Sequence, residues 1–524
     1  MVTKLLIGEA VSKTESDYDQ IPYVEYAHEH THPGKLRVIG RLFGMQPAAP
    51  ENCRVLELGS ASGTNLIQMG YFLPESEFVG VELSQNQAEQ AHRQVQQLHL
   101  TNVQAKHFDI MEVNDSFGKF DYIIVHGIFS WVSRPVQDKI LEICRRNLTE
   151  QGIAYVSYNA YPGWFSQQSI KELMLFHAAK FEDSKQKLKE SLALVRLCDT
   201  AAAQRTDHFS QFMHQQFQSV LNKPPEYVNH EFLEDTNEPV YFHDFISRAT
   251  TNGLQYLGES ELAAMACANL PPGWEHVPRE TREQQVAVEQ YVDFLRNTQF
   301  RRTLLCQSEI RLPPVPDSSV LTEMSFNGHI RSEAVDDGQV CFHVGNKTMT
   351  TSDAGNIAVM EALAAAWPGD LDFDALKDVS QRALTRAGDA ETYLLTLLLE
   401  CASHQMVTTA HPYLNSSEWH LAPTDRVNPL VRAQLQAQQL VFDRRSRPVP
   451  LSDLEREVAT RLDGRRHATI VNELVGKAKR GEIVLKENGA PLVGTHYRVK
   501  EILAGEVKST LSRFAKLQLL QASA

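Results

Sequence analysis

A strand that runs into a glycine-rich turn and then a helix is the strongest chemical signal in this sequence. The turn reads Glu57-Leu-Gly59-Ser-Ala-Ser-Gly63. Glycine leaves room for a ligand to approach the backbone, and the free N–H groups at the start of the next helix can hold a polar or anionic group. Glu82 follows at the end of the next predicted strand, where a carboxylate can accept both hydroxyls of a ribose. We therefore expect a nucleoside-containing cofactor at this turn.

The same turn disfavours a dinucleotide. The fingerprint G-x-G-x-x-G would require glycine at positions 61 and 64, where this chain has Ala61 and Thr64. A pyrophosphate needs the backbone to approach closely at the middle glycine, so Ala61 argues against NAD. The remaining cofactor contacts are expected around the turn and at the ends of the following strands, with Asp109 where an adenine amino group would lie. These expected cofactor contacts are Ser60, Ala61, Asn65, Leu83, Asp109, Ile110, His126 and Gly127.

The segments around the turn predict a doubly wound α/β fold. Between residues 53 and 159, short β-branched runs alternate with longer helical stretches, which is typical of a parallel sheet with helices on both faces. We expect strands at 54–58, 77–82, 103–108, 120–125 and 153–158, and helices at 63–72, 86–98 and 136–148. A helix at 242–252 and strands at 254–257 and 302–307 would complete the sheet.

The spacing of Glu57, Gly59 and Gly63 resembles that of Rossmann-like methyltransferases that use S-adenosyl-L-methionine. Further segments resemble a more specific family within this class. They are residues 157–164, which read SYNAYPGW, and residues 18–23, 31–33, 127–132 and 241–245. Over roughly residues 15–310 the chain is similar to a bacterial family with a methyltransferase regulatory domain, and within it to rickettsial protein-lysine methyltransferases that modify surface proteins. The resemblance implies S-adenosyl-L-methionine as cofactor, a homodimer and an open groove for an extended protein substrate.

Five residues near the expected methyl position are candidates for catalysis. They are His126, Trp131, Tyr158, Tyr161 and Trp164. A lysine acceptor must be uncharged and in line with the bond from sulfur to methyl, which is mainly a positioning task. Aromatic faces stabilise positive charge near the methyl group, and His126 or a tyrosine could take the lysine proton. The same aromatic residues around a Pro-Gly turn also suit a structural corner.

The chain divides into four predicted units. Residues 1–165 and 240–310 form the methyltransferase domain, which a helical insertion at 166–239 interrupts as a lid, a regulatory element or a dimer contact. A Pro-rich linker at 312–317 follows, then a mixed middle domain at 318–410. The signals for the middle domain are strands near 328–330 and 340–344 and helices at 352–366 and 391–404. A winged-helix-like domain at 411–524 is indicated by a helix at 471–479, a strand at 482–486 and a turn at 488–489.

Charge and hydropathy narrow the partners. The net charge of −14 disfavours nucleic acid and anionic membranes. From Arg444 onward, however, 16 Lys and Arg stand against 9 Asp and Glu, so this segment could bind DNA or an acidic protein. No apolar run approaches the roughly 18–20 residues of a membrane span, and the N-terminus lacks a signal-peptide pattern, so we expect a cytoplasmic protein. The alternatives are a small-molecule methyltransferase and a regulatory protein that uses the cofactor fold with a basic C-terminal domain.

Histidines and cysteines are the remaining candidates for metal ligands. Seven cysteines without a C-x-x-C pair argue against a disulfide framework and a structural zinc site. His28, His30 and His32 alternate, so on a strand they would share one face, as ligands do. No Cys, Asp or further His follows at metal-like spacing, and we predict a polar loop and no metal.

Overall fold

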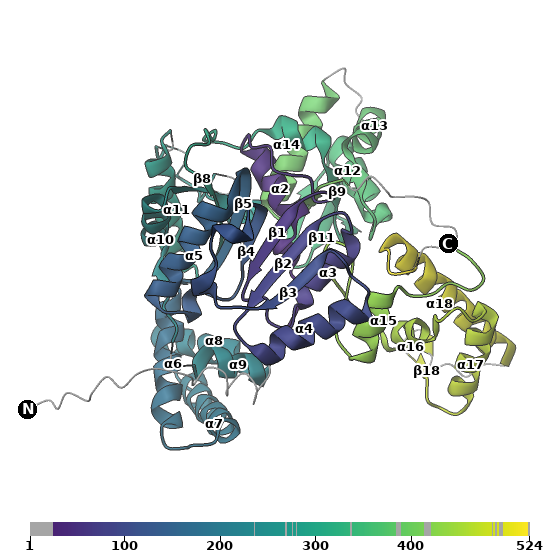
Figure 1. The fold of residues 1–524 in the computed structure, drawn as a ribbon. Coiled ribbons are helices and arrows are strands. Elements are labelled where there is room, and N and C mark those ends of the chain that lie inside the picture. Colours follow the sequence, from purple (N-terminus) through teal and green to yellow (C-terminus); the bar gives the residue numbers. More distant parts are fainter. Residues whose placement is uncertain are drawn as a thin grey trace, which may run out of the picture.

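The computed structural model describes residues 25–521 apart from 235, 268–269, 275, 279, 336–337, 384–388, 413–420, 485, 488–489 and 492–495. A twisted central sheet lies between layers of helices, a helical insertion projects from one side of it, and the C-terminal helices pack at another side (Figure 1). None of the described helices is long and apolar enough to cross a membrane.

The central sheet has eight strands in the order β3-β2-β1-β4-β5-β8-β7, with β6 paired to β5. The first five are parallel: β1 (Arg54–Leu58), β2 (Glu77–Glu82), β3 (Val103–His107), β4 (Phe120–Val125) and β5 (Leu148–Tyr161). β8 (Phe300–Gln307) runs antiparallel to both β5 and β7 (Leu254–Glu259), and β6 is Val240–Tyr241. The predicted doubly wound sheet is confirmed, and the strand order reverses between β1 and β4, where such folds bind ligands.

Helices cover both faces of the sheet. On one face, α2 (Pro33–Leu42) and α3 (Thr64–Phe72) share a core with Val55 and Tyr122. On the other face, α5 (Arg134–Asn147) and α10 (Phe242–Thr251) share a core with Leu56 and Ile123. Because neighbouring residues of β1 and β4 are buried on opposite faces, these strands are almost continuously apolar. The predicted helix at 86–98 is α4 (Gln85–Gln97).

The helical insertion is a small bundle with its own core. It comprises α6 (Trp164–Ala178), α7 (Ser184–Ala203), α8 (His208–Leu221) and α9 (Pro225–Phe232). Asp183 and Asp207 begin α7 and α8 by accepting hydrogen bonds from the backbone N–H of Gln186 and Ser210, which satisfies donors that a helix end leaves unpaired.

The middle segment packs directly on the methyltransferase core. Its helices α12 (Ala354–Ala366), α13 (Phe373–Ala383) and α14 (Ala390–Ser403) bury side chains in the same apolar cluster as α2. The predicted strand at 340–344 is β11 (Val340–Val344), which pairs on either side with β10 (Arg331–Ala334) and β12 (Lys347–Thr351). The strand predicted near 328–330 is wrong in its bounds, because the strand there is β9 (Ser325–Asn327), which lies between β13 (Leu371–Asp372) and β14 (Thr408–Ala410).

The C-terminal unit contains four helices around a separate core. They are α15 (Pro429–Gln436), α16 (Asp453–Arg461), α17 (His467–Lys479) and α18 (His496–Lys516). The strand predicted at 482–486 is wrong in its bounds, because among the described residues of this segment the strand is β17 (Lys486–Glu487), paired with β18 (Ala490–Pro491). The predicted turn at 488–489 lies outside the described residues, as does the motif at 18–23.

Part of the basic charge of the C-terminal unit is neutralised inside the chain. Arg445 is buried and its guanidinium contacts a carboxylate oxygen of Asp370 at 2.6 Å. Arg447 pairs with Asp443 at 2.7 Å. The amide of Gln68 in α3 donates to the carbonyl of Asp443 at 2.8 Å. The contacts of Arg445 and Gln68 attach the C-terminal unit to the middle segment and to α3. The charges of Arg445 and Arg447 are balanced by carboxylates of the same chain.

Candidate cofactor site

The glycine-rich turn between β1 and α3 is tightly packed against the rest of the protein. Gly59 and Gly63 have φ values of 71° and 80°, which glycine adopts without strain. A Cβ atom on Gly59 would lie 2.4 Å from Cδ1 of Ile128, and one on Gly63 would lie 2.9 Å from Cβ of Ala91. The two glycines therefore let the turn approach the end of β4 and α4.

Glu82 holds the turn from the end of β2. One carboxylate oxygen accepts a hydrogen bond from the N–H of Ala61 and the other accepts from the N–H of Ser84, both at 2.9 Å. Burial raises the pKa of Glu82. Each oxygen keeps a second lone pair, so the carboxylate can also accept the hydroxyls of a ribose, as predicted.

Glu57 and Ser60 contribute buried oxygen atoms that have no partner within the protein. Glu57 accepts a hydrogen bond from the side-chain amide of Asn65 at 2.8 Å, but its second oxygen, Oε2, is buried without a partner. The hydroxyl of Ser60 is also buried and unpaired. Burial raises the pKa of Glu57 to about 8. Unsatisfied buried polar atoms are costly, and a polar cofactor bound at this turn would satisfy them.

The N-terminal segment closes over the turn, which sequence reasoning missed. Ser62 donates from its backbone N–H and its hydroxyl to the carboxylate of Glu25, at 2.9 and 2.6 Å. The N–H of His28 donates to the side-chain carbonyl of Asn65 at 2.9 Å. Residues separated by 37 positions meet here without any periodic pattern, so no local signal in the sequence could have identified Glu25.

The end of β4 places His126 and Gly127 beside this turn. Nδ1 of His126 lies 3.1 Å from the hydroxyl of Tyr155 and 3.0 Å from that of Ser157. Gly127 has a φ of 68° and open space where a Cβ would lie. Burial lowers the pKa of His126 well below its usual value, so its imidazole is uncharged at neutral pH.

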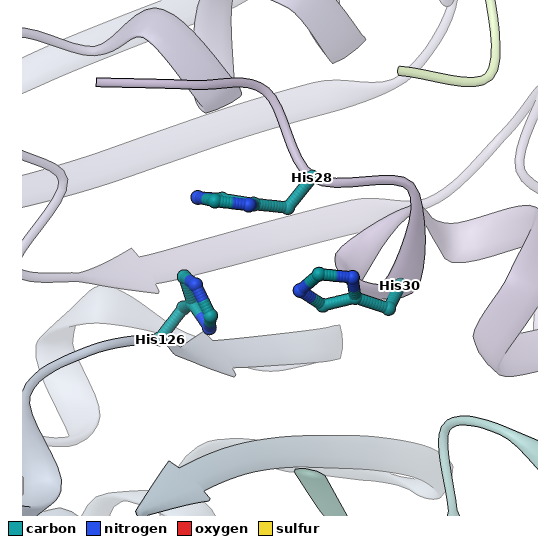
Figure 2. Close-up of side chains that lie close together, drawn as sticks. All are labelled: His28, His30 and His126. Atoms are coloured by element: carbon teal, nitrogen blue, oxygen red, sulfur yellow. The ribbon is translucent and has the colours of Figure 1, made fainter. Parts of the chain in front are cut away.

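A cluster of three histidines forms at this point, in a combination that the sequence did not suggest. The rings of His28, His30 and His126 face a common space (Figure 2). His32 faces elsewhere, because its Nδ1 accepts a hydrogen bond from the N–H of Gly34 at 3.1 Å and so begins α2. The sequence-based expectation of no metal considered His32 and omitted His126.

Leu83, Asp109 and Ile110 lie at the ends of β2 and β3. Leu83 is exposed, and Ile110 begins a short 3₁₀ helix. The carboxylate of Asp109 accepts a hydrogen bond from the N–H of Met111 at 2.8 Å. A contact between this edge and an adenine base stays a prediction.

Two of the predicted catalytic aromatics are buried in packing positions. Tyr158 stacks 4.3 Å from Phe245 of α10, and its hydroxyl lies 2.9 Å from that of Thr303. Trp164 begins α6 and packs 6.2 Å from Phe232 of α9. Both side chains are enclosed by the core. Such surroundings suit a structural role, and a catalytic role for either residue stays a prediction.

The other two aromatics, Tyr161 and Trp131, are partly exposed. Tyr161 stacks 4.4 Å from Phe165 and 5.4 Å from Tyr241. The ammonium nitrogen of Lys171 in α6 lies over the ring of Trp131, 5.6 Å from its centroid. This contact connects the insertion to the segment that follows β4. The four predicted aromatic residues therefore do not form one cluster.

Three family models match the chain. They are a methyltransferase domain at 50–222, a predicted methyltransferase regulatory domain at 224–307 and the PKMT C-terminal winged helix domain at 426–519. The uncharacterized protein RP028 of Rickettsia prowazekii (strain Madrid E) is 38% identical over 240 residues, which cover 46% of this chain and 96% of that protein. This chain belongs to the S-adenosylmethionine-dependent methyltransferases with a methyltransferase regulatory domain.

Longer matches cover nearly the whole methyltransferase. The uncharacterized protein RP789 of R. prowazekii is 29% identical over 521 residues, which cover 96% of this chain and 93% of that protein. Two structures of PKMT2 from Rickettsia typhi, one of them in complex with AdoHcy, are 27% and 28% identical, with TM-scores of 0.83 and 0.84; each covers 95% of this chain and 100% of that one. S-adenosyl-L-methionine is the cofactor of these methyltransferases, and AdoHcy is the product that remains after the cofactor has lost its methyl group.

The match to the regulatory domain, at residues 224–307, overlaps the predicted insertion at 166–239 only in part. It begins at residue 224 and includes α9, α10, β7, α11 (Arg282–Arg296) and β8. Only residues 224–239 of the insertion expected at 166–239 belong to it. The match therefore assigns the regulatory label mainly to the last part of the sheet and its covering helices.

Replacement of Glu82 by alanine should weaken cofactor binding. The change removes the expected acceptor of the ribose hydroxyls and the acceptor of the N–H of Ala61. We therefore expect a loss of about 1.5–3 kcal/mol, roughly ten- to a hundred-fold in Kd for S-adenosylhomocysteine. Calorimetry would measure it, with Glu89→Ala on the exposed face of α4 as the control. Equal affinity in Glu82→Ala and the unmutated protein would remove Glu82 from the cofactor site.

Replacement of Glu57 by glutamine should change how stability depends on pH. The folded protein holds a proton on Glu57 up to a pKa of about 8, whereas the unfolded chain releases it near pH 4.3. The stabilising contribution of this proton is therefore complete at low pH and disappears as the pH rises from about 4 to about 8.

Urea unfolding of the cofactor-free protein over this pH range would test the effect. We expect the free energy of unfolding of the unmutated protein, relative to that of Glu57→Gln, to fall as the pH rises. Glu89→Gln is the matched exposed control. If the curves of the unmutated protein and Glu57→Gln ran parallel, Glu57 would not be a buried, protonated group.

Proposed function

We propose that this methyltransferase transfers methyl groups from S-adenosyl-L-methionine to lysine side chains of a protein. The observation that carries the proposal is the match of 95% of the chain to the whole of PKMT2 from R. typhi, with a TM-score of 0.83. PKMT stands for protein-lysine methyltransferase. The PKMT winged helix domain at 426–519 supports the same acceptor.

The environment at the end of β4 suits an uncharged amine. The cofactor supplies an electrophilic methyl group on a positively charged sulfur. Burial lowers the pKa values of His28, His30 and His126, and the positive charge of Arg302 lowers them further. The same two effects disfavour an ammonium ion, so a lysine side chain entering this region would lose its proton more readily than in water.

An exposed aromatic surface at the end of β5 supports a protein substrate. We call Tyr161, Phe165, Tyr241 and Phe294 the β5 patch. The centroids of neighbouring rings in the patch lie 4.4–6.5 Å apart, and Phe165 and Phe294 are 55% and 54% exposed. Exposed groups of large apolar side chains mark interaction surfaces, and aromatic faces bind ammonium and methylated ammonium groups.

The proposal includes a homodimer formed through the helical insertion. Within the insertion, the side chains of Leu188 and Leu192 are used in the core of the bundle. Others remain available, because Phe176, Leu197 and Phe209 are 76%, 66% and 72% exposed. Side chains of this size at such exposure favour burial against a second copy.

The acceptor is tested by incubating the purified protein with S-adenosylmethionine that carries an isotopically labelled methyl group and a bacterial protein extract. We expect mass spectrometry of peptides to place the label on lysine Nζ. An extract whose lysines have been acetylated should accept no label. Label found only in the small-molecule fraction would contradict a protein acceptor and favour a small-molecule methyltransferase.

Replacement of Phe165 by glutamate should impair recognition of the protein acceptor. A charge in the β5 patch removes apolar contact area, so we expect KM for the acceptor to rise about ten-fold or more. We expect kcat and the affinity for S-adenosylhomocysteine to stay unchanged. Val315→Glu, at an exposed position of the 312–317 linker, is the matched control. If KM stayed unchanged in Phe165→Glu, the patch would have no part in substrate binding.

A further inference from the structure

Three imidazoles from two distant parts of the sequence lie together beside the cofactor turn. His28 and His30 lie on the N-terminal segment, and His126 follows β4. One nitrogen of each ring lies within 4.8 Å of the corresponding nitrogen of the other two. Figure 2 shows the three rings turned toward the same space. The fold thus gathers three nitrogen donors at one point.

One of the three rings presents a nitrogen that the protein leaves unpaired. A neutral imidazole carries a lone pair on one nitrogen, and metal ions bind through that lone pair. Nε2 of His30 is buried and has no hydrogen-bond partner in the protein, which costs stability unless a ligand meets it.

The separations of the rings approach those of imidazoles that share one ion. A tetrahedral ion with nitrogen ligands at about 2.0–2.1 Å holds ring centroids roughly 5 Å apart. The centroid of His30 lies 5.3 Å from those of His28 and His126. His28 and His126 are closer, at 4.1 Å, so His28 must move outward by about 1 Å. It lies on a stretch without regular secondary structure, which permits this movement.

The surroundings of His126 orient its ring for coordination. Nδ1 of His126 is within hydrogen-bonding distance of the hydroxyls of Tyr155 and Ser157. A histidine that bonds through one nitrogen to a fixed oxygen presents the other nitrogen as a ligand. This arrangement leaves Nε2 of His126 for the common space. Arg302 opposes any cation here by its charge, so the nitrogen donors must provide the affinity.

We propose that His28, His30 and His126 bind a divalent transition-metal ion of the zinc class, with a fourth position left open to solvent or a substrate group. Imidazole nitrogens suit zinc, copper, iron and nickel. The ion would join the N-terminal segment, which carries Glu25, to the end of β4 and so hold the cover of the cofactor turn in place. The inference goes beyond the proposed lysine methyltransferase activity and does not rest on it.

The test uses the full-length protein, without a polyhistidine tag and stripped of metal by a chelator. On titration with Co²⁺, we expect about one equivalent to bind and to give the intense visible absorption bands of four-coordinate cobalt, which one equivalent of Zn²⁺ should abolish. His30→Ala should lose these bands and bind at least about ten-fold more weakly. His92→Ala, on the exposed face of α4, should behave like the unmutated protein.

Two further measurements keep the test decisive. Thermal unfolding of His30→Ala shows whether this variant is folded. His30→Gln is a second variant that removes the imidazole nitrogen of His30 while keeping a side chain of similar length. Identical cobalt spectra in the unmutated protein and both variants would overturn the proposal, as would the absence of such bands in the unmutated protein. Lysine methylation by a protein that binds no metal would overturn this inference alone, whereas metal binding without lysine methylation would overturn only the proposed function.

Discussion

The side chain of Asn65 connects the separate parts on which the cofactor site depends. Its amide donates to Glu57 at the end of β1, and its carbonyl accepts from the backbone of His28. Asn65 also lies within hydrogen-bonding distance of the hydroxyl of Thr31. One buried amide in the first turn of α3 thus fixes the strand, the helix and the N-terminal segment relative to one another. Without it, Glu57 and the N–H of His28 would lose partners in a region that water reaches poorly.

The glycines of the turn serve the protein as well as the ligand. The sequence suggests that Gly59 and Gly63 leave space for a cofactor, but Ile128 and Ala91 occupy the space where their side chains would lie. A large residue at Gly59 would therefore displace the end of β4 as well as a ligand, and loss of binding in such a variant would not identify a direct contact. A change at Glu82 is easier to interpret, because its carboxylate contacts the turn through the N–H of Ala61, while its other oxygen accepts from the N–H of Ser84 just after β2.

The sheet could be predicted from the sequence, whereas much of the site could not. β1 to β5 follow from buried apolar runs at regular spacing, because local periodicity determines where strands form. Contacts such as those of His126 with His28 depend on how distant segments pack, and no spacing encodes them. Tyr158 illustrates a different difficulty: both faces of a central strand are buried, so an aromatic residue that packs against α10 has the same sequence pattern as one that faces a ligand. The winged-helix strand was misplaced because a two-residue pairing is too short for periodicity.

Burial at the end of β4 links the chemistry of the two proposals. An environment that removes the proton from an imidazole also favours the neutral form of an amine, because both charged forms lose hydration there. A divalent ion at the three histidines would add positive charge beside Arg302 and strengthen this preference. The same ion would repel the positively charged sulfur of S-adenosylmethionine more than the uncharged sulfur of S-adenosylhomocysteine. Metal occupancy would therefore shift the balance between S-adenosylmethionine and S-adenosylhomocysteine even if no lysine ever contacts the ion.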